Sequence, residues 1–300
     1  MPLTSCYKPI INGVHRRYNR NEMQPEDTAQ KERLKQLLEK ILANPPMKTS
    51  LRLFLLYGQE HARGVLLELD WGRVADGLTE LCRNILKVQP TCSLALSGGK
   101  TPEALYLLLG TRHYQREVEW ERVHLFWGDE RYVPHDDPRS NYRMVREAWL
   151  SKANLPPENI HPMPTHYPNP DDAARAYEDE LRAYFGDAEP YPHFDLMLLG
   201  LGEDGHIASL FPNDPALEET TRWVVPSRAP VEPHQRLTLT LPVINHAYRI
   251  WFLVKGVSKR EAIEKLFREP ADTSLPAARV EYNGERFWWL SPELLAIAKQ

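Results

Sequence analysis

Apolar residues recur along the chain with two different spacings, which predict alternating strands and helices from Met47 onward. Short apolar runs or alternations typical of strands occupy residues 51–57, 64–69, 93–96, 123–127, 195–200, 237–241, 250–254 and 287–290. Helical spacing covers residues 71–88, 102–110, 141–153, 170–185, 258–268 and 292–298. The first two strands are expected to form a hairpin. Strands separated by helices predict an α/β fold with a mainly parallel, doubly wound sheet and helices on both faces.

The first part of the chain does not follow this alternation. Residues 1–47 are expected to form an N-terminal extension, and residues 48–300 a single domain. The extension contains one predicted amphipathic helix, from Asp27 or Thr28 to about Ala43, because its leucines recur at helical spacing. Met47 directly precedes the first strand-like run and is therefore an alternative start of translation.

Charge and cysteine content narrow the choice of partner and compartment. The chain has 37 Lys and Arg against 41 Asp and Glu, so its formal charge of −4 does not favour nucleic acid. A small anion would need a local cationic pocket. No apolar run reaches the roughly 18 residues that cross a bilayer, so no membrane partner is expected. Cys6, Cys82 and Cys92 are odd in number and form no CxxC, which favours a reducing, cytoplasmic location.

Ligands of open α/β sheets bind outside the carboxyl ends of the strands, so the residues after each strand are the first candidates for a site. Gly98 and Gly99 follow the strand at 93–96, and Thr101 then precedes a helix that opens on Pro102. Glycines allow backbone N–H groups to turn inward, and the helix start adds free N–H groups with partial positive charge. This segment predicts a phosphate cradle, with a tight strand–helix turn as the alternative.

Charged residues follow the strand at 123–127. Gly128 ends the strand, and Asp129, Glu130 and Arg131 come directly after it. Arg131 could hold a phosphate or orient a carboxylate through two hydrogen bonds. Asp129 could bind a hydroxyl group or position a catalytic imidazole. The alternative is a surface cluster of ion pairs.

A glycine-rich loop with one histidine follows the strand at 195–200. His206 comes after Asp204 and Gly205 and suits a general base, because imidazole titrates near neutral pH. A hydrogen-bonded turn histidine is the alternative. Arg236 and Lys255, beside later strands, could add positive charge for a phosphate or could be solvated charges. The chain has no HxxxH or HExxH motif and no cysteine pair with ligand spacing, so neither a metal nor a cofactor is expected.

Taken in order, these segments resemble the 6-phosphogluconolactonase family over about residues 50–298. The matching pieces are 96–102, 127–134 with Ser140-Asn141-Tyr142, and 200–212. Arg236-Leu237-Thr238 and residues 255–259 follow in the expected order.

The resemblance implies a sheet like that of glucosamine-6-phosphate deaminases and ribose-5-phosphate isomerases. It implies hydrolysis of 6-phospho-D-glucono-1,5-lactone to 6-phospho-D-gluconate in the oxidative pentose phosphate pathway, without a cofactor. By position, His206 would be the base and Asp129 its catalytic partner. Contacts to substrate or phosphate would come from Ser97, Gly98, Gly99, Thr101, Arg131, Asn141, Arg236 and Lys255. A small sugar-phosphate lactone is the expected partner of a monomer or weak homodimer.

Two other functions stay open from the sequence. A glucosamine-6-phosphate deaminase is the related enzyme, but the residues after His206 fit the lactonase pattern better. A non-catalytic sugar-phosphate sensor is the second alternative, although such a protein would need neither His206 nor Asp129.

Overall fold

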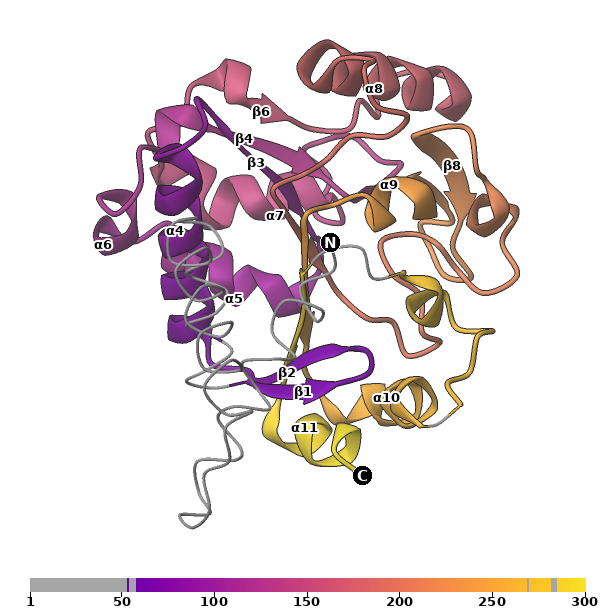
Figure 1. Cartoon of the computed structure of the whole chain (residues 1–300). Helices are drawn as coiled ribbons and strands as arrows, with labels where there is room; N and C mark the ends of the chain where they lie inside the picture. Colours follow the sequence, from indigo (N-terminus) through magenta and orange to yellow (C-terminus); the bar gives the residue numbers. More distant parts are fainter. Residues whose placement is uncertain (1–52, 54–57, 269, 282–284) are drawn as a thin grey trace, which may run out of the picture.

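A computed structural model describes residues 53, 58–268, 270–281 and 285–300 of the protein (Figure 1). The expected N-terminal helix, the alternative start at Met47 and most of the expected strand at 51–57 lie outside these residues. Leu53 is described and is helical and buried, so it does not belong to a strand.

A central sheet runs through the described part of the chain in the order β1-β2-β11-β10-β7-β3-β4-β6. Only the hairpin of β1 and β2 is antiparallel, and the other neighbouring pairs are parallel. The strands are β1 (Gln59–His61), β2 (Gly64–Glu68), β3 (Cys92–Leu96), β4 (Val123–Trp127), β6 (Ile160–His161), β7 (Leu196–Leu199), β10 (Arg249–Val254) and β11 (Glu285–Leu290). The predicted mainly parallel sheet is confirmed.

Helices cover both faces of this sheet, as predicted. They are α4 (Trp71–Leu86), α5 (Lys100–Leu109), α6 (Arg112–Gln115), α7 (Asn141–Ala148), α8 (Pro170–Phe185), α9 (Leu241–Asn245), α10 (Arg260–Phe267) and α11 (Pro292–Ala298). Figure 1 shows α4 and α5 on one side of the sheet and α9 and α10 on the other. Helix α4 begins where the Asp70 carboxylate accepts a hydrogen bond from the N–H of Arg73, and its apolar stripe is buried. None of the described helices is long and apolar enough to cross a membrane.

A second, antiparallel sheet was not predicted. It consists of β5 (Asp129–Arg131), β9 (Gln235–Leu239) and β8 (Val224–Arg228), in the order β5-β9-β8. The expected strand at 237–241 is part of it, shifted toward the N-terminus by two residues. Strand β5 consists of three charged residues, so it carries none of the apolar alternation by which a strand is recognised.

Several boundaries differ from the expected ones. The expected hairpin exists, but its first strand is β1 and not residues 51–57. Helix α5 begins at Lys100, which makes Pro102 its third residue instead of its first. Proline is tolerated there because the first N–H groups of a helix have no partner within it. Helix α7 stops at Ala148 and is followed by a 3₁₀ turn at Leu150–Lys152.

Large aromatic side chains fill the core. All eight tryptophans of the chain lie in the described part, and seven are almost completely buried: Trp120, Trp127, Trp149, Trp223, Trp251, Trp288 and Trp289. Phe252 of β10 and Trp288 of β11 are register partners whose rings stack with their centroids 3.7 Å apart. This packing fixes β10, whose carboxyl end lies beside the candidate site.

Candidate active site

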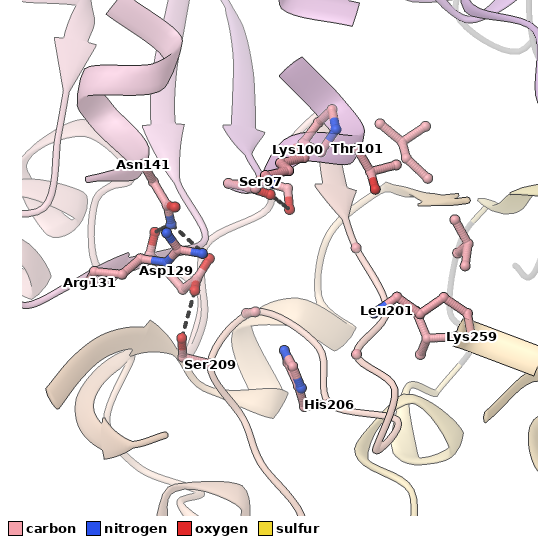
Figure 2. A pocket seen from close by; sticks show the side chains of 18 of the residues that line it. Ser97, Lys100, Thr101, Asp129, Arg131, Asn141, Leu201, His206, Ser209 and Lys259 are labelled. Atoms are coloured by element: carbon pink, nitrogen blue, oxygen red, sulfur yellow. Dashed lines mark hydrogen bonds between the residues drawn. The ribbon is translucent and has the colours of Figure 1, made fainter. Parts of the chain in front are cut away.

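A cavity of about 310 Å³ lies at the carboxyl ends of β3, β4, β7 and β10 (Figure 2). All ten residues singled out from the sequence line it: Ser97, Gly98, Gly99, Thr101, Asp129, Arg131, Asn141, His206, Arg236 and Lys255. Figure 2 shows Asp129, Arg131 and Asn141 on one side, Lys100, Thr101 and Lys259 on the other, and His206 between them. The cavity therefore has cationic groups on both sides of an imidazole.

The glycine loop after β3 brings backbone groups to the cavity wall. Its first residue, Ser97, is fixed by Tyr106 of α5, whose hydroxyl accepts from the Ser97 N–H (3.1 Å) and donates to its carbonyl (2.8 Å). Gly99 has a φ of +90°, a conformation that favours glycine. No side chain caps the N-terminus of α5, so the N–H groups there are free of the usual capping bond.

A second glycine of this loop is required by close packing. A Cβ atom at Gly98 would overlap the side-chain amide of Asn141. Asn141, the first residue of α7, donates from Nδ2 to the Asp129 carbonyl at 2.9 Å. The contact therefore ties the glycine loop, α7 and β5 together around one side of the cavity.

Strand β5 divides its three side chains between two environments, because successive residues of a strand point to opposite faces. Asp129 and Arg131 line the cavity, whereas Glu130 is buried against the start of α7. The Glu130 carboxylate accepts from the N–H groups of Asn141 (2.7 Å) and Tyr142 (2.8 Å), where the helix dipole favours negative charge. Burial raises the pKa of Glu130 to about 7. This arrangement does not fit the alternative of a surface ion-pair cluster.

Two arginines stand opposite each other in the small sheet. Arg131 of β5 and Arg236 of β9 are register partners, and such partners share one face of a sheet. Arg236 is only 6% exposed, and burial together with the charge of Arg131 lowers its pKa. Its buried Nη1 has no hydrogen-bond partner among the residues that the structure describes. A buried, unpaired guanidinium nitrogen beside a second arginine is an arrangement that an anionic ligand would stabilise.

The loop after β7 presents His206 to the cavity. The loop is closed by a hydrogen bond from the Gly202 N–H to the His206 carbonyl (2.8 Å), and Gly205 takes a φ of +79°. His206 Nδ1 lies 2.5 Å from Asp204 Oδ1. A carboxylate there places the ring proton on Nδ1, which leaves Nε2 able to accept a proton. The ring of Phe211 packs against the imidazole with centroids 4.5 Å apart.

Asp129 does not hold the His206 imidazole, which was one of its two expected roles: the carboxylate bonded to the imidazole is that of Asp204. Asp129 Oδ2 instead accepts from Ser209 Oγ at 2.6 Å. The other expected role, binding a hydroxyl group, stays a prediction. Asp204 was missed as a functional residue, although its place two residues before His206 in a glycine-rich loop was an available signal. Lys259 was also left out and lines the cavity.

The fold and this cavity define a class: an α/β protein with a cavity lined by cationic side chains and an Asp–His pair at the carboxyl edge of its sheet. Comparisons with known proteins narrow the class. Residues 71–289 match the family described as glucosamine-6-phosphate isomerases/6-phosphogluconolactonase. The chain belongs to this family.

Individual relatives support the same assignment. A 6-phosphogluconolactonase of Synechocystis sp. is 46% identical over 203 residues, which are 67% of this chain and 82% of that protein. One from Mycobacterium leprae is 38% identical over 230 residues, 75% of this chain and 92% of that protein. The crystal structure of 6-phosphogluconolactonase from Thermotoga maritima has 30% identity and a TM-score of 0.66, covering 75% of this chain and 97% of that one. The resemblance found in the sequence is confirmed.

Proposed function

We propose that His206 is the general base with which this chain hydrolyses 6-phospho-D-glucono-1,5-lactone to 6-phospho-D-gluconate, its reaction in the oxidative pentose phosphate pathway. The observation that carries the proposal is the Asp204–His206 pair. The pair leaves Nε2 free to accept a proton. The same cavity holds Arg236, whose buried Nη1 has no hydrogen-bond partner in the described part of the chain. A proton acceptor beside fixed positive charge suits the addition of water to an ester carbonyl.

The proposed reaction begins with a water molecule between His206 and the lactone carbonyl. Nε2 takes a proton from this water while the water oxygen attacks C1 of the lactone. Negative charge then develops on the carbonyl oxygen. Arg131 stabilises that charge. The C1–O5 bond then breaks, and the imidazolium returns its proton to O5, which leaves as a hydroxyl group. His206 ends the cycle neutral, and the new carboxyl group loses its proton to solvent to give 6-phosphogluconate.

The phosphate of the substrate is proposed to occupy the opposite side of the cavity. Free N–H groups at the start of α5, the Thr101 hydroxyl and the Lys255 ammonium group are available there. Ser97, Gly98 and Gly99 shape this wall, whereas Asn141 and Arg236 belong to the Asp129 side. Binding energy from the phosphate would hold C1 near His206 and so convert affinity into positioning.

The compartment and assembly are part of the proposal. The Sγ atoms of Cys82 and Cys92 lie 3.9 Å apart and are not bonded, which suits a reducing, cytoplasmic location. A monomer or weak homodimer is proposed as the assembly. The net charge of −4 gives no support for a nucleic-acid partner.

The decisive experiment follows 6-phosphogluconate formation from freshly generated lactone. The purified protein is expected to accelerate ring opening in proportion to its concentration, above the rate of the lactone alone. The same sample is tested for ammonia release from glucosamine 6-phosphate, which a deaminase would show. Tight binding of 6-phosphogluconate by folded protein without any acceleration would instead favour the sensor and contradict the proposal.

The Asp204–His206 pair predicts a specific pH dependence. Activity is expected to fall at acid pH, because a protonated imidazole cannot accept a proton from water. Burial by itself would raise the pKa of Asp204. The hydrogen bond to His206 and the charge of that imidazole have the larger combined effect, so the pKa of Asp204 is lowered. Asp204→Asn should reduce kcat about tenfold or more, because the amide no longer holds the imidazole as the carboxylate does at 2.5 Å, with Nε2 free to accept a proton.

The neighbouring Glu203 provides a control with the same change in charge. Glu203→Gln removes one negative charge without touching the imidazole, since Glu203 lies beside Lys259, 4.0 Å away. Its kcat should stay close to that of the unmodified protein. Equal kcat values in Asp204→Asn and the unmodified protein would show that Asp204 does not act on His206.

A further inference from the structure

Ser209 connects the histidine loop to the aspartate on the other side of the cavity. It lies three residues after His206 and is only 2% exposed. Its Oγ donates to Asp129 Oδ2 at 2.6 Å, and Figure 2 shows this bond running from the loop to β5. One serine therefore links the element that carries the His206 imidazole to the element that carries the Asp129 carboxylate.

The backbone of Ser209 is fixed as firmly as its side chain. Its N–H donates to Thr238 Oγ1 of β9 at 3.2 Å, and its carbonyl accepts from Ser227 Oγ of β8 at 2.7 Å. Thr238 is completely buried and is the register partner of Asp129. The small sheet thus holds Ser209 by its peptide groups while Ser209 holds the Asp129 carboxylate.

The hydrogen bond from Ser209 is the shorter of two that orient the Asp129 carboxylate. Asn141 Nδ2 also approaches this carboxylate, but its distance to Oδ1 is 3.5 Å. The two carboxylate oxygens are thus held by hydrogen bonds of unequal length. The shorter one, from Ser209 to Oδ2, restrains rotation of the carboxylate about its Cβ–Cγ bond. The carboxylate accepts both bonds, which leaves lone pairs of Oδ1 available toward the cavity for a substrate hydroxyl.

We propose that Ser209 is a positioning residue for lactone hydrolysis: its hydroxyl fixes the rotation of the Asp129 carboxylate and the distance between that carboxylate and the His206 loop. The proposal rests on the proposed function and adds to it that the Asp129 carboxylate, which lines the cavity, accepts a hydrogen bond from a substrate hydroxyl. A small displacement of such a group lowers turnover steeply, since the reacting atoms must stay within a narrow range of distances.

The test compares two alanine variants that remove the same kind of hydrogen bond. Ser209→Ala should lower kcat about 10- to 100-fold with a smaller change in KM. Ser93→Ala is the matched control, because Ser93 is also 2% exposed and its Oγ donates to the buried Asp195 carboxylate at 3.0 Å. Ser93 lies near the start of β3, at the other end from the cavity. Both variants should show a similar drop in Tm, but only Ser209→Ala should lose turnover.

A double-mutant cycle separates a positioning role from a merely structural one. If Ser209 acts through Asp129, adding Ser209→Ala to Asp129→Ala should cause little further loss of kcat. Multiplicative losses would overturn the proposal, and so would a Ser209→Ala variant as active as Ser93→Ala. If instead Asp129→Ala keeps full turnover, the substrate contact of Asp129 and this inference fail while the proposed function stands; if His206→Ala keeps full turnover, the proposed function itself fails.

Discussion

Replacing His206 with alanine is expected to lower kcat by about 10²- to 10⁴-fold, the range contributed by a positioned general base. The imidazole is held by Asp204 at 2.5 Å and is partly exposed to the cavity, so its loss removes the proton acceptor without opening the core. Tm should change little. Initial rates of 6-phosphogluconate formation measure the effect, with the spontaneous opening of the lactone subtracted.

A histidine elsewhere in the fold provides the control. His193 Nδ1 lies 2.6 Å from the His246 carbonyl, near the start of β7 and away from the cavity. His193→Ala should keep the turnover of the unmodified protein. Added imidazole should restore part of the activity of His206→Ala, since it can enter the space left by the side chain. Turnover in His206→Ala within a few-fold of the unmodified protein would remove His206 from the role of base.

Substituting Gly202 with alanine is expected to cost nearly as much activity, although Gly202 has no chemistry of its own. The added Cβ would overlap His206 Nδ1 and Asp204 Oδ1, so the imidazole or the carboxylate must move. Displacing a general base from its substrate lowers turnover about 10²-fold or more. We expect this loss in kcat, with far-ultraviolet circular dichroism unchanged, because the clash lies between a loop and half-exposed side chains.

Gly128→Ala separates this clash from the general effect of adding a methyl group. A Cβ at Gly128 would meet only the Leu96 carbonyl oxygen at 3.5 Å, an ordinary contact distance, and Gly128 does not line the cavity. This variant should retain most of its activity. If Gly202→Ala were as active as Gly128→Ala, the position of His206 in the structure would be wrong.

Some elements could be predicted to the residue because their signals are local. Strand β4 (Val123–Trp127) ends at a glycine, and α8 and α11 each begin at a proline that follows a polar capping position. Strand β5 has no local signal, because its Asp-Glu-Arg sequence forms a strand only by pairing with β9. Its conformation is set by residues more than one hundred positions away, which no pattern within the segment records.

The site was predictable in position but not in its hydrogen bonds. The rule that ligands bind at the carboxyl ends of parallel strands identified residues from β3, β4, β7 and β10 that do line one cavity. Which carboxylate reaches the imidazole depends on side-chain rotamers and loop closure. The sequence alone does not distinguish Asp129 from Asp204 as the hydrogen-bond partner of His206. Only the path of the folded loop brings the Asp204 carboxylate to the imidazole Nδ1.

Because of its buried tryptophans, the folding of this protein can be followed by fluorescence separately from its activity. Seven indoles lie in the core, and no tryptophan is among the residues that line the cavity. Unfolding should therefore shift the intrinsic fluorescence to longer wavelengths, while substitutions confined to the cavity should leave the emission of the native protein in place. A variant that is inactive in the lactonase assay but keeps the short-wavelength emission of the native protein has lost its activity and kept its fold.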